Sequence, residues 1–512
     1  MVEGEEYIPL PQSNRLLTSK RLEKGEEMAT SGLKADVERK RLLQRVCEEA
    51  LRMAKPSEEE KRRTLRFSRD LTENLSEKLK SAGIEAEVEV QGSIAKDTWL
   101  AGEKDIDIFI LLPRKYGREG FLKALEVAKN LAREGWREAY AEHPYIEAKI
   151  EGYTVDFVPC FKVKEASEAA SSVDRTPLHT LYMKRRLSDP VRDEVRLLKR
   201  FMRGIGTYGA EIKVGGFSGY LCEVLILHYG SFLKVLEAAS KWKKGELIDV
   251  ENHYKGRREE AEKLFQGAPL IVVDPIDETR NLASSIGKTR LNEFIAASRE
   301  FRKRPSLRFF YPGDVEPIPA GRLREVLERK GTSMVIVKFG PVEAVPDILW
   351  GQLYKSRRAI RGLIRRHGFR IIRDHVWSDE ENLNVLLFEL ESLRLPAVKK
   401  HAGPPLEKAE DCERFLEKYL NSELAVSGPR VEGDRWVVEV RRPYTDAATL
   451  LKEELKDGGR TLGVASLVSK AISESLEVLV DHEIVPLYKS NREFAKFLTE
   501  YLSGRPRWLE RD

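Results

Sequence analysis

Residues 92–113 read GSIAKDTWLAGEKDIDIFILLP, and the second half of this stretch decides the fold around it. The run DIDIFILL is short and rich in isoleucine, which predicts a buried strand that ends before Pro113. Because side chains alternate along a strand, Asp105 and Asp107 point to one face with their Cα atoms about 6.6–6.8 Å apart. Paired carboxylates supply the hard oxygen ligands that Mg²⁺ prefers. The stretch therefore predicts a metal site at the mouth of a buried strand.

A third carboxylate, Asp156, lies inside another apolar strand pattern, YTVDFVPC over residues 153–160. A buried carboxylate loses hydration free energy unless a cation or hydrogen bonds compensate it. Three acids on neighbouring strands could hold two Mg²⁺ ions about 3.5–4 Å apart, an arrangement that stabilises both reacting oxygens of a phosphoryl transfer. We therefore expect Asp105, Asp107 and Asp156 to be metal ligands and catalytic residues, with one carboxylate free to activate an attacking hydroxyl.

Just upstream, Gly92 and Ser93 follow a half-buried strand pattern, EAEVEVQ over residues 85–91. A glycine allows a phosphate to approach the backbone closely, and a serine offers it a hydroxyl. The pair is therefore predicted to contact a phosphate group.

The composition is that of a globular chain with a charged exterior. Of its 512 residues, 41% are hydrophobic and 34% are charged, with a net charge of +5. No run approaches the ~20 apolar residues of a membrane span, and the N-terminus lacks a signal-peptide pattern, so we expect a cytoplasmic protein with no membrane partner. The four cysteines form no C-x-x-C pair, which argues against a zinc ribbon, an iron–sulfur cluster or a disulfide scaffold.

The remaining pattern predicts a multidomain α+β protein. A capping box at residues 57–60 opens a helix that runs to about Lys80, and apolar residues repeat with helical spacing from about Val191. From about residue 305, strands and helices mix again. We expect four parts: a flexible N-terminal extension over 1–40, a mixed-sheet head domain with flanking helices over 41–190, a helical central domain over 191–304, and an α+β body and tail over 305–512.

A one-sided basic helix is predicted within residues 351–373, which contain eight basic residues and no acidic one. Leu353, Ile360, Leu363 and Ile364 share one arc of the helical wheel. A solvated helix face usually carries both charge signs, whereas a purely basic stripe suits a phosphate backbone that is read by charge. The candidate RNA-binding residues on the other side are Lys355, Arg357, Arg358, Arg361, Arg365 and Arg366.

The stretch that begins at Gly92 resembles the signature of the DNA polymerase beta nucleotidyltransferase superfamily, and more narrowly that of the archaeal (class I) tRNA CCA-adding enzymes. Further segments match that family in chain order from about Leu42 to the C-terminus, strongly to about Asn281 and weakly after about Pro305. They are AEHPY, VDFVPCFKV, SSVDRTPLH, EVRLLK, YGAEIKVGGFSGYLCE and VVDPIDETRN. The resemblance implies a polymerase-beta-like nucleotidyltransferase head and a C-terminal RNA-binding region.

The resemblance also implies roles for individual residues at matching positions. Asp105, Asp107 and Asp156 fall on the metal-binding carboxylates of the family, and Arg280 falls on the arginine that reads the incoming base. The first metal position is Asp105 where the family has Glu. Lys96 replaces an Arg, so it would contact phosphate as a point charge rather than as a bidentate fork. The implied nucleotide-binding residues are Gly92, Ser93, Lys96, His179, Lys199, Tyr208 and Arg280.

The activity implied by the resemblance is template-independent addition of C, C and A to the 3′ end of tRNA from CTP and ATP, with Mg²⁺ as cofactor and pyrophosphate as product. The partner would be the acceptor and TΨC stem of tRNA, held by shape and phosphate contacts. Because members of the family often form dimers, a homodimer is a further expectation. Two alternatives stay open: a poly(A) polymerase or other template-independent RNA 3′-nucleotidyltransferase, and a non-catalytic RNA-binding protein on a nucleotidyltransferase fold.

Overall fold

The computed structural model describes residues 36–140 and 143–510 of the chain. The chain divides into two compact units, Met1–Gly313 with Arg507–Asp512, and Asp314–Pro506. The described part begins with a helix over residues 36–54. Most of the expected N-terminal extension, residues 1–35, lies outside the described residues.

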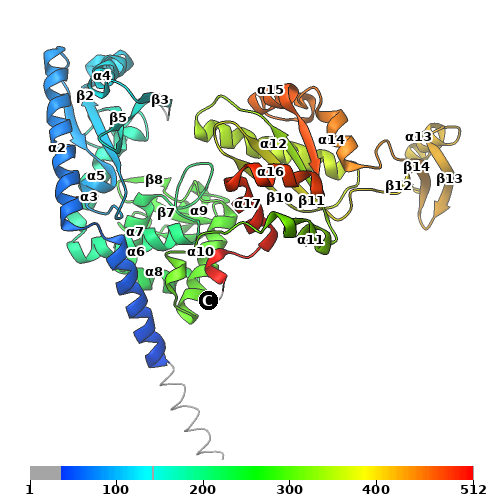
Figure 1. Cartoon of the computed structure of the whole chain (residues 1–512), viewed down its shortest axis with the longest axis horizontal. Coiled ribbons are helices and arrows are strands. Elements are labelled where there is room, and N and C mark those ends of the chain that lie inside the picture. The colour runs from blue at the N-terminus through cyan, green and yellow to red at the C-terminus, as the bar shows by residue number, and fades with distance from the viewer. Residues whose placement is uncertain (1–35, 141–142, 511–512) are drawn as a thin grey trace, which may run out of the picture. The chain divides into compact units, whose positions relative to one another are not determined.

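The head domain is built on a five-stranded mixed sheet (Figure 1). In spatial order the strands are β1 (Glu87–Val90), β2 (Asp105–Leu112), β5 (Tyr153–Phe161), β4 (Pro144–Ile150) and β3 (Trp136–Tyr140). β2 and β5 run parallel, and every other neighbouring pair is antiparallel. The buried strand predicted before Pro113 is confirmed as β2.

Two helices, α2 (Glu58–Ser81) and α4 (Gly117–Ala132), cover one face of this sheet. α2 begins as predicted at Ser57, whose hydroxyl accepts the backbone N–H of Glu60 at 3.1 Å. Alternate residues of β2, starting at Ile106, pack into the apolar core between the sheet and these helices. Because side chains alternate along a strand, the two aspartates of β2 lie on the opposite face.

The rest of the first unit is mainly helical. Its elements are α5 (Thr176–Arg186), α6 (Asp189–Gly204), α7 (Gly219–Tyr229), α8 (Phe232–Ala239), β6 (Glu246–Ile248), α9 (Arg258–Leu264), β7 (Leu270–Asp274), β8 (Asp277–Asn281) and α10 (Lys288–Lys303). Phe201 of α6 lies at the centre of a ring cluster that includes Phe232 and Phe301. Trp508, near the C-terminus, packs on Phe309 of the same unit with ring centroids 5.3 Å apart.

Within residues 36–140 and 143–510, no single helix is long and apolar enough to cross a membrane. The pair α7 and α8 passes the same test together, but the two helices are bent by 92° at their junction. Most of their apolar side chains belong to the core of the first unit.

The second unit contains a four-stranded antiparallel sheet with an apolar core on each face. The strand order is β10 (Ile371–Ser378), β11 (Asn384–Leu390), β9 (Ser333–Phe339) and β15 (Glu477–Val480). One face is covered by α12 (Pro346–Arg366), α14 (Ala447–Leu455) and α15 (Ser466–Ser475). The other face is covered by α11 (Ala320–Lys330), α16 (Val485–Ser490) and α17 (Arg492–Ser503).

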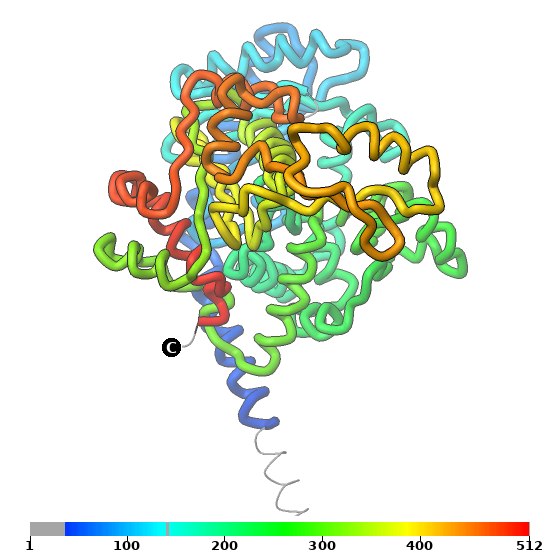
Figure 2. The backbone as a smooth tube through the Cα atoms, turned by 90° about the vertical axis from the view of Figure 1, so that its right-hand side faces the viewer, coloured from blue at the N-terminus to red at the C-terminus, as the bar shows by residue number. Residues whose placement is uncertain are grey.

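A smaller three-stranded sheet forms a separate lobe of the second unit, seen in yellow and orange in Figure 2. Its strands, in spatial order, are β12 (Val398–Pro405), β14 (Arg435–Arg441) and β13 (Ala425–Glu432). They pack against α13 (Ala409–Tyr419) through a small apolar cluster around Phe415 and Val438. The α+β class predicted from the sequence is thus confirmed in both units.

Candidate active site

The carboxylates of β2 and β5 lie on one face of the head sheet. The two strands run parallel in a register that places Asp107 beside Asp156, and Asp105 beside Thr154. Neighbouring strands are about 4.8 Å apart, and residues in register on such strands project to the same face. The structure therefore brings Asp107 and Asp156 side by side, with Asp105 two residues away on the same face.

Burial and repulsion between neighbouring carboxylates raise the pKa of Asp107 and of Asp156. Burial raises the pKa of Asp107, with Lys96 opposing the shift and Asp105 adding to it. Burial also raises the pKa of Asp156 to about 7, and repulsion from Asp107 and from Glu147 of β4 adds to this effect. A bound cation would relieve such a cluster of like charges, because an opposite charge favours the ionised form of each acid.

The donor set fits a hard divalent cation. Oδ1 of Asp156 is buried, and no hydrogen-bond partner is found for it among the described residues. Carboxylate oxygens are the ligands that Mg²⁺ prefers. No three His, Cys, Asp or Glu side chains in the described part of the chain are already placed as ligands of one ion. The donor atoms of the site are thus of the type that suits a hard divalent cation.

A short helix, α3 (Gly92–Lys96), connects β1 to β2 and carries the Gly-Ser pair. Gly92 has a φ of +65°, and a Cβ atom there would lie 1.9 Å from Oδ2 of Asp107. Only glycine therefore allows the Asp107 carboxylate to lie against the backbone next to Ser93. The backbone N–H of Gln91 donates to the carbonyl oxygen of Asp107 at 2.8 Å, which holds the start of α3 against β2.

A fully buried carboxylate on α7 joins two of the predicted nucleotide-binding lysines. Glu223 accepts hydrogen bonds from Lys96 Nζ and from Thr98 Oγ1, both at 2.6 Å. Lys199 Nζ lies 3.3 Å from the same carboxylate and donates to Thr98 Oγ1 at 2.9 Å. Burial alone would raise the pKa of Glu223, but Lys96 and Lys199 outweigh burial and hold that pKa below its usual range. The cluster fixes Lys96 at the end of α3 and Lys199 on α6.

Tyr208 and Lys199 both approach Gly219, at the start of α7. A Cβ atom on Gly219 would lie 3.0 Å from the Tyr208 hydroxyl oxygen and 3.5 Å from Lys199 Nζ. Lys96, which the family resemblance places on a phosphate-contacting loop, is the last residue of α3 and is buried against Glu223. Sequence reasoning missed Glu223, although it is the one acidic residue in the apolar helix GYLCEVLILHY. A lone acid in such a helix is the signal that would have identified it.

A second buried carboxylate, Asp274 at the end of β7, joins two more predicted residues. Its Oδ2 lies 2.9 Å from Nε2 of His179 on α5 and 3.5 Å from Nη1 of Arg280 on β8. The ring of Tyr220 packs on His179 with centroids 4.1 Å apart. Asp274 thus fixes the orientation of both side chains, and sequence reasoning did not single it out.

The segment between β5 and α5 is held by Asp174, another buried residue that was not predicted to be functional. Its carboxylate accepts backbone N–H groups from Phe161 at 2.8 Å and from Ala170 and Ser171, each at 2.9 Å. These bonds close the loop that leads from the strand of Asp156 to the helix of His179. Asp174 therefore stabilises the backbone of the loop that joins these two elements.

The predicted basic stripe of α12 has fewer exposed members than expected. Arg357 and Arg361 are half-buried and pair with Asp374 of β10 at 3.2 and 3.4 Å. The helical wheel did not include this acid, which follows the basic stretch in sequence and lies on the adjacent strand. The exposed members of the stripe are Lys355, Arg358, Arg365 and Arg366.

Three segments of the chain match known protein families. Residues 70–179 match the nucleotidyltransferase domain, residues 193–311 match the second domain of tRNA nucleotidyltransferases, and residues 330–481 match the C-terminal domain of CCA-adding enzymes. The first match contains β2, β5 and their carboxylates. Fold and site therefore define a nucleotidyltransferase.

Curated relatives match nearly the whole chain. A CCA-adding enzyme from Methanosarcina mazei is 37% identical over 88% of this chain and 97% of its own length. Another from Pyrobaculum islandicum is 38% identical over 82% of this chain and 96% of its own length. Among solved structures, a cytoplasmic RNA terminal U-transferase covers 52% of this chain and 95% of its own, with a TM-score of 0.40 and 14% identity. The curated relatives show that the chain belongs to the family of CCA-adding enzymes, as its motifs predicted.

Proposed function

We propose that this enzyme adds C, C and A, without a nucleic-acid template, to the 3′ end of tRNA, using CTP and ATP and releasing pyrophosphate. The observation that carries the proposal is the register of β2 and β5, which sets Asp107 beside Asp156 with Asp105 on the same face. The CCA-adding relatives support the choice of substrates, because the chain covers 97% of the Methanosarcina mazei enzyme.

Asp105, Asp107 and Asp156 are the residues that would hold Mg²⁺, and two ions are expected. When bound, the metal would neutralise charge on the triphosphate and in the transition state. Oδ1 of Asp156, which lacks a hydrogen-bond partner among the described residues, accepts the proton of the tRNA 3′-hydroxyl. The oxygen of that hydroxyl attacks the α-phosphorus of the nucleotide, and the bond to pyrophosphate breaks.

Gly92 and Ser93 bind the phosphates through the backbone and a hydroxyl, with the charges of Lys96 and Lys199 nearby. Both lysines are held beside one buried carboxylate, so they act on the triphosphate as fixed charges. Fixed charges of this kind need no rearrangement as the reaction proceeds. The Tyr208 hydroxyl lies near Gly219, as the Lys199 side chain does, and holds the sugar or a phosphate.

Base selection is assigned to Arg280, whose side chain is 34% exposed and is oriented by Asp274. A guanidinium offers only donors, so it pairs with hydrogen-bond acceptors. Cytosine and adenine carry an unprotonated ring nitrogen where uracil and guanine carry an N–H, so Arg280 and the tRNA end together favour C and A. His179, bonded to the same aspartate, holds the nucleotide from α5.

Extension of a tRNA that lacks its terminal CCA tests the proposal. With Mg²⁺ and CTP alone we expect two additions, and with CTP and ATP together we expect three, after which extension stops. A long A tail made from ATP would instead identify a poly(A) polymerase. Binding of tRNA with no addition would identify a non-catalytic RNA-binding protein. Either of these outcomes would overturn the proposal.

Gly92→Ala should lower nucleotide addition roughly 10- to 100-fold, the loss that follows when reacting groups shift by about 1 Å. The added methyl group would occupy the position of the Asp107 carboxylate oxygen, and alanine also disfavours the positive φ of Gly92. Gly83→Ala is the matched control, because Gly83 has a φ of +73° but open space at its Cβ position. Single-turnover rates measure the loss, and equal losses in both variants would rule out the steric explanation.

Arg358→Ala combined with Arg365→Ala should weaken tRNA binding roughly tenfold and lower the slope of log K against log salt by about 1–2. These residues lie seven positions apart on the exposed side of α12, where both suit contact with backbone phosphates. Arg322→Ala with Arg329→Ala is the matched control, since both are exposed and equally spaced on α11. Filter binding at several salt concentrations checks this, and an unchanged salt slope would remove α12 from the RNA interface.

A further inference from the structure

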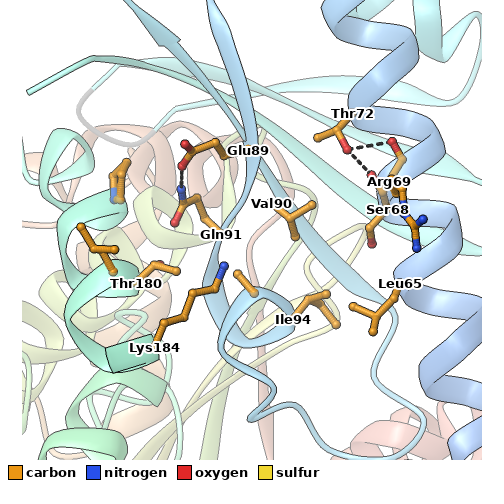
Figure 3. Close-up of a pocket in the computed structure, with 13 residues that line it drawn as sticks. Leu65, Ser68, Arg69, Thr72, Glu89, Val90, Gln91, Ile94, Thr180 and Lys184 are labelled. Atoms are coloured by element: carbon orange, nitrogen blue, oxygen red, sulfur yellow. Dashed lines mark hydrogen bonds between the residues drawn. The ribbon is translucent and has the colours of Figure 1, made fainter. Parts of the chain in front are cut away.

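A pocket of about 510 Å³ opens beside α3, at the edge of the head sheet formed by β1 (Figure 3). Its walls come from α2, from β1 and α3, and from α5, all within the first unit. Apolar side chains line much of it, including Val90, Ile94 and Leu181. Small-molecule sites typically enclose about 300–1,000 Å³ and combine apolar walls with a few polar groups. The residues that line this pocket include none of the residues assigned to metal or nucleotide binding.

Two buried polar atoms of the pocket lining have no hydrogen-bond partner among the described residues. Gln91 is 1% exposed, and its Oε1 is unsatisfied although its Nε2 donates to Glu89 at 2.8 Å. Thr180 is 4% exposed, and its Oγ1 is also unsatisfied. Folded proteins contain few such atoms, because burial without a hydrogen bond is costly. Two of them in one pocket point to a ligand that supplies at least one donor.

Positive charge flanks the pocket on opposite walls. Arg69 of α2 and Lys184 of α5 both line it and are exposed, and no acidic partner is found for either within the described chain. Figure 3 shows the Lys184 side chain extending from α5 toward Gln91. The acidic residue that lines the pocket, Glu89, is engaged by the amide of Gln91. A ligand with an anionic group and a flat, partly apolar body would match this lining.

We propose that the pocket binds a nucleoside monophosphate unit, either free in solution or as one nucleotide of an RNA strand. The base lies on the apolar wall of Val90, Ile94 and Leu181, and an N–H of its ring or amino group donates to Gln91 Oε1. The hydroxyl of Thr180 bonds the base or the sugar, and a phosphate lies between the two flanking cations. Gln91 immediately precedes Gly92 and Ser93, so an occupied pocket contacts the start of α3, which carries this phosphate-binding pair.

Titration of the full chain with AMP and with CMP, in EDTA to withhold divalent ions from the carboxylates, tests the proposal. We expect saturable binding with a Kd below about 1 mM. Leu181→Glu places negative charge on the pocket wall and should weaken binding at least tenfold. Leu122→Glu, on α4, is the matched control because both leucines are exposed, at 46% and 57%. Thr180→Val removes the unsatisfied hydroxyl at nearly constant shape and should weaken binding about threefold to tenfold.

A four-nucleotide RNA distinguishes the two sources of the ligand. Binding at least tenfold tighter than AMP, with the same sensitivity to Leu181→Glu, identifies an RNA strand, and equal affinity identifies the free nucleotide. No saturable binding of either probe, or binding that Leu181→Glu leaves unchanged, overturns the proposal. Binding that is lost in Asp107→Asn but kept in Leu181→Glu would place the probe in the transferase site, and that result also overturns it.

Discussion

Asp107→Asn should lower the rate of CCA addition by roughly a thousandfold or more while leaving tRNA affinity nearly unchanged. Asparagine keeps the size of the side chain but removes a negative charge from between Gly92 and Asp156, where the metal and the triphosphate are expected to bind. Single-turnover incorporation of labelled CTP into tRNA that lacks CCA measures the rate. Filter binding of the same tRNA measures the affinity.

Glu147→Gln is the matched control for this prediction. Glu147 lies in register with Asp156 on β4, so it belongs to the same row of acids, but it pairs with Arg137 at 2.9 Å. We expect its loss to lower the rate less than tenfold, because no role in metal binding is assigned to it. Substantial turnover by Asp107→Asn, or an equal loss in Glu147→Gln, would contradict the assignment of the metal site to the three aspartates.

Glu223→Gln should destabilise the first unit by roughly 3–5 kcal/mol, the loss typical when one partner of a buried ion pair is removed. The variant leaves Lys96 and Lys199 buried next to a neutral amide, and no other acidic partner at such short range is found for either lysine within residues 36–140 and 143–510. Thermal unfolding followed by circular dichroism should show a fall in Tm on the order of 10 °C.

Glu237→Gln is the control for the stability measurement, since Glu237 pairs with Lys241 at 3.1 Å on the exposed side of α8. Exposed pairs contribute little, so its Tm should match that of the unchanged protein. Adding Lys199→Met to Glu223→Gln removes one unpaired buried charge and should recover part of the lost stability. If the Tm of the Glu223→Gln variant equals that of the unchanged protein, this cluster does not stabilise the first unit.

Local signals predicted the elements that hold the acids. The run DIDIFILL before Pro113 has the length and composition of a buried strand, and the structure shows β2 there. Ser57 caps α2, as its spacing to Glu60 predicted. Alternation along β2 also predicted that Asp105 and Asp107 share a face. What alternation cannot predict is the parallel pairing with β5, because strand neighbours depend on the whole topology.

Contacts between distant segments could not be predicted in the same way. Lys96 and Glu223 are 127 residues apart, and His179 and Asp274 are 95 residues apart. Tertiary packing, rather than periodicity, sets partners at such separations. The helical wheel of α12 could not show Asp374 for the same reason, because this partner of Arg357 and Arg361 lies on a neighbouring strand.

Asp105, Asp107 and Asp156 are proposed to form one metal site beside an incoming triphosphate. A crystal structure of the full chain with Mn²⁺ and a CTP analogue that cannot transfer its nucleotide tests this claim most directly, because anomalous scattering locates the metal. We predict metal peaks bound by Asp105 and Asp107, contact between Asp156 and one of these metals, and phosphates along Gly92 and Ser93. Metal and triphosphate bound elsewhere, or Asp156 turned away from both, would contradict the account.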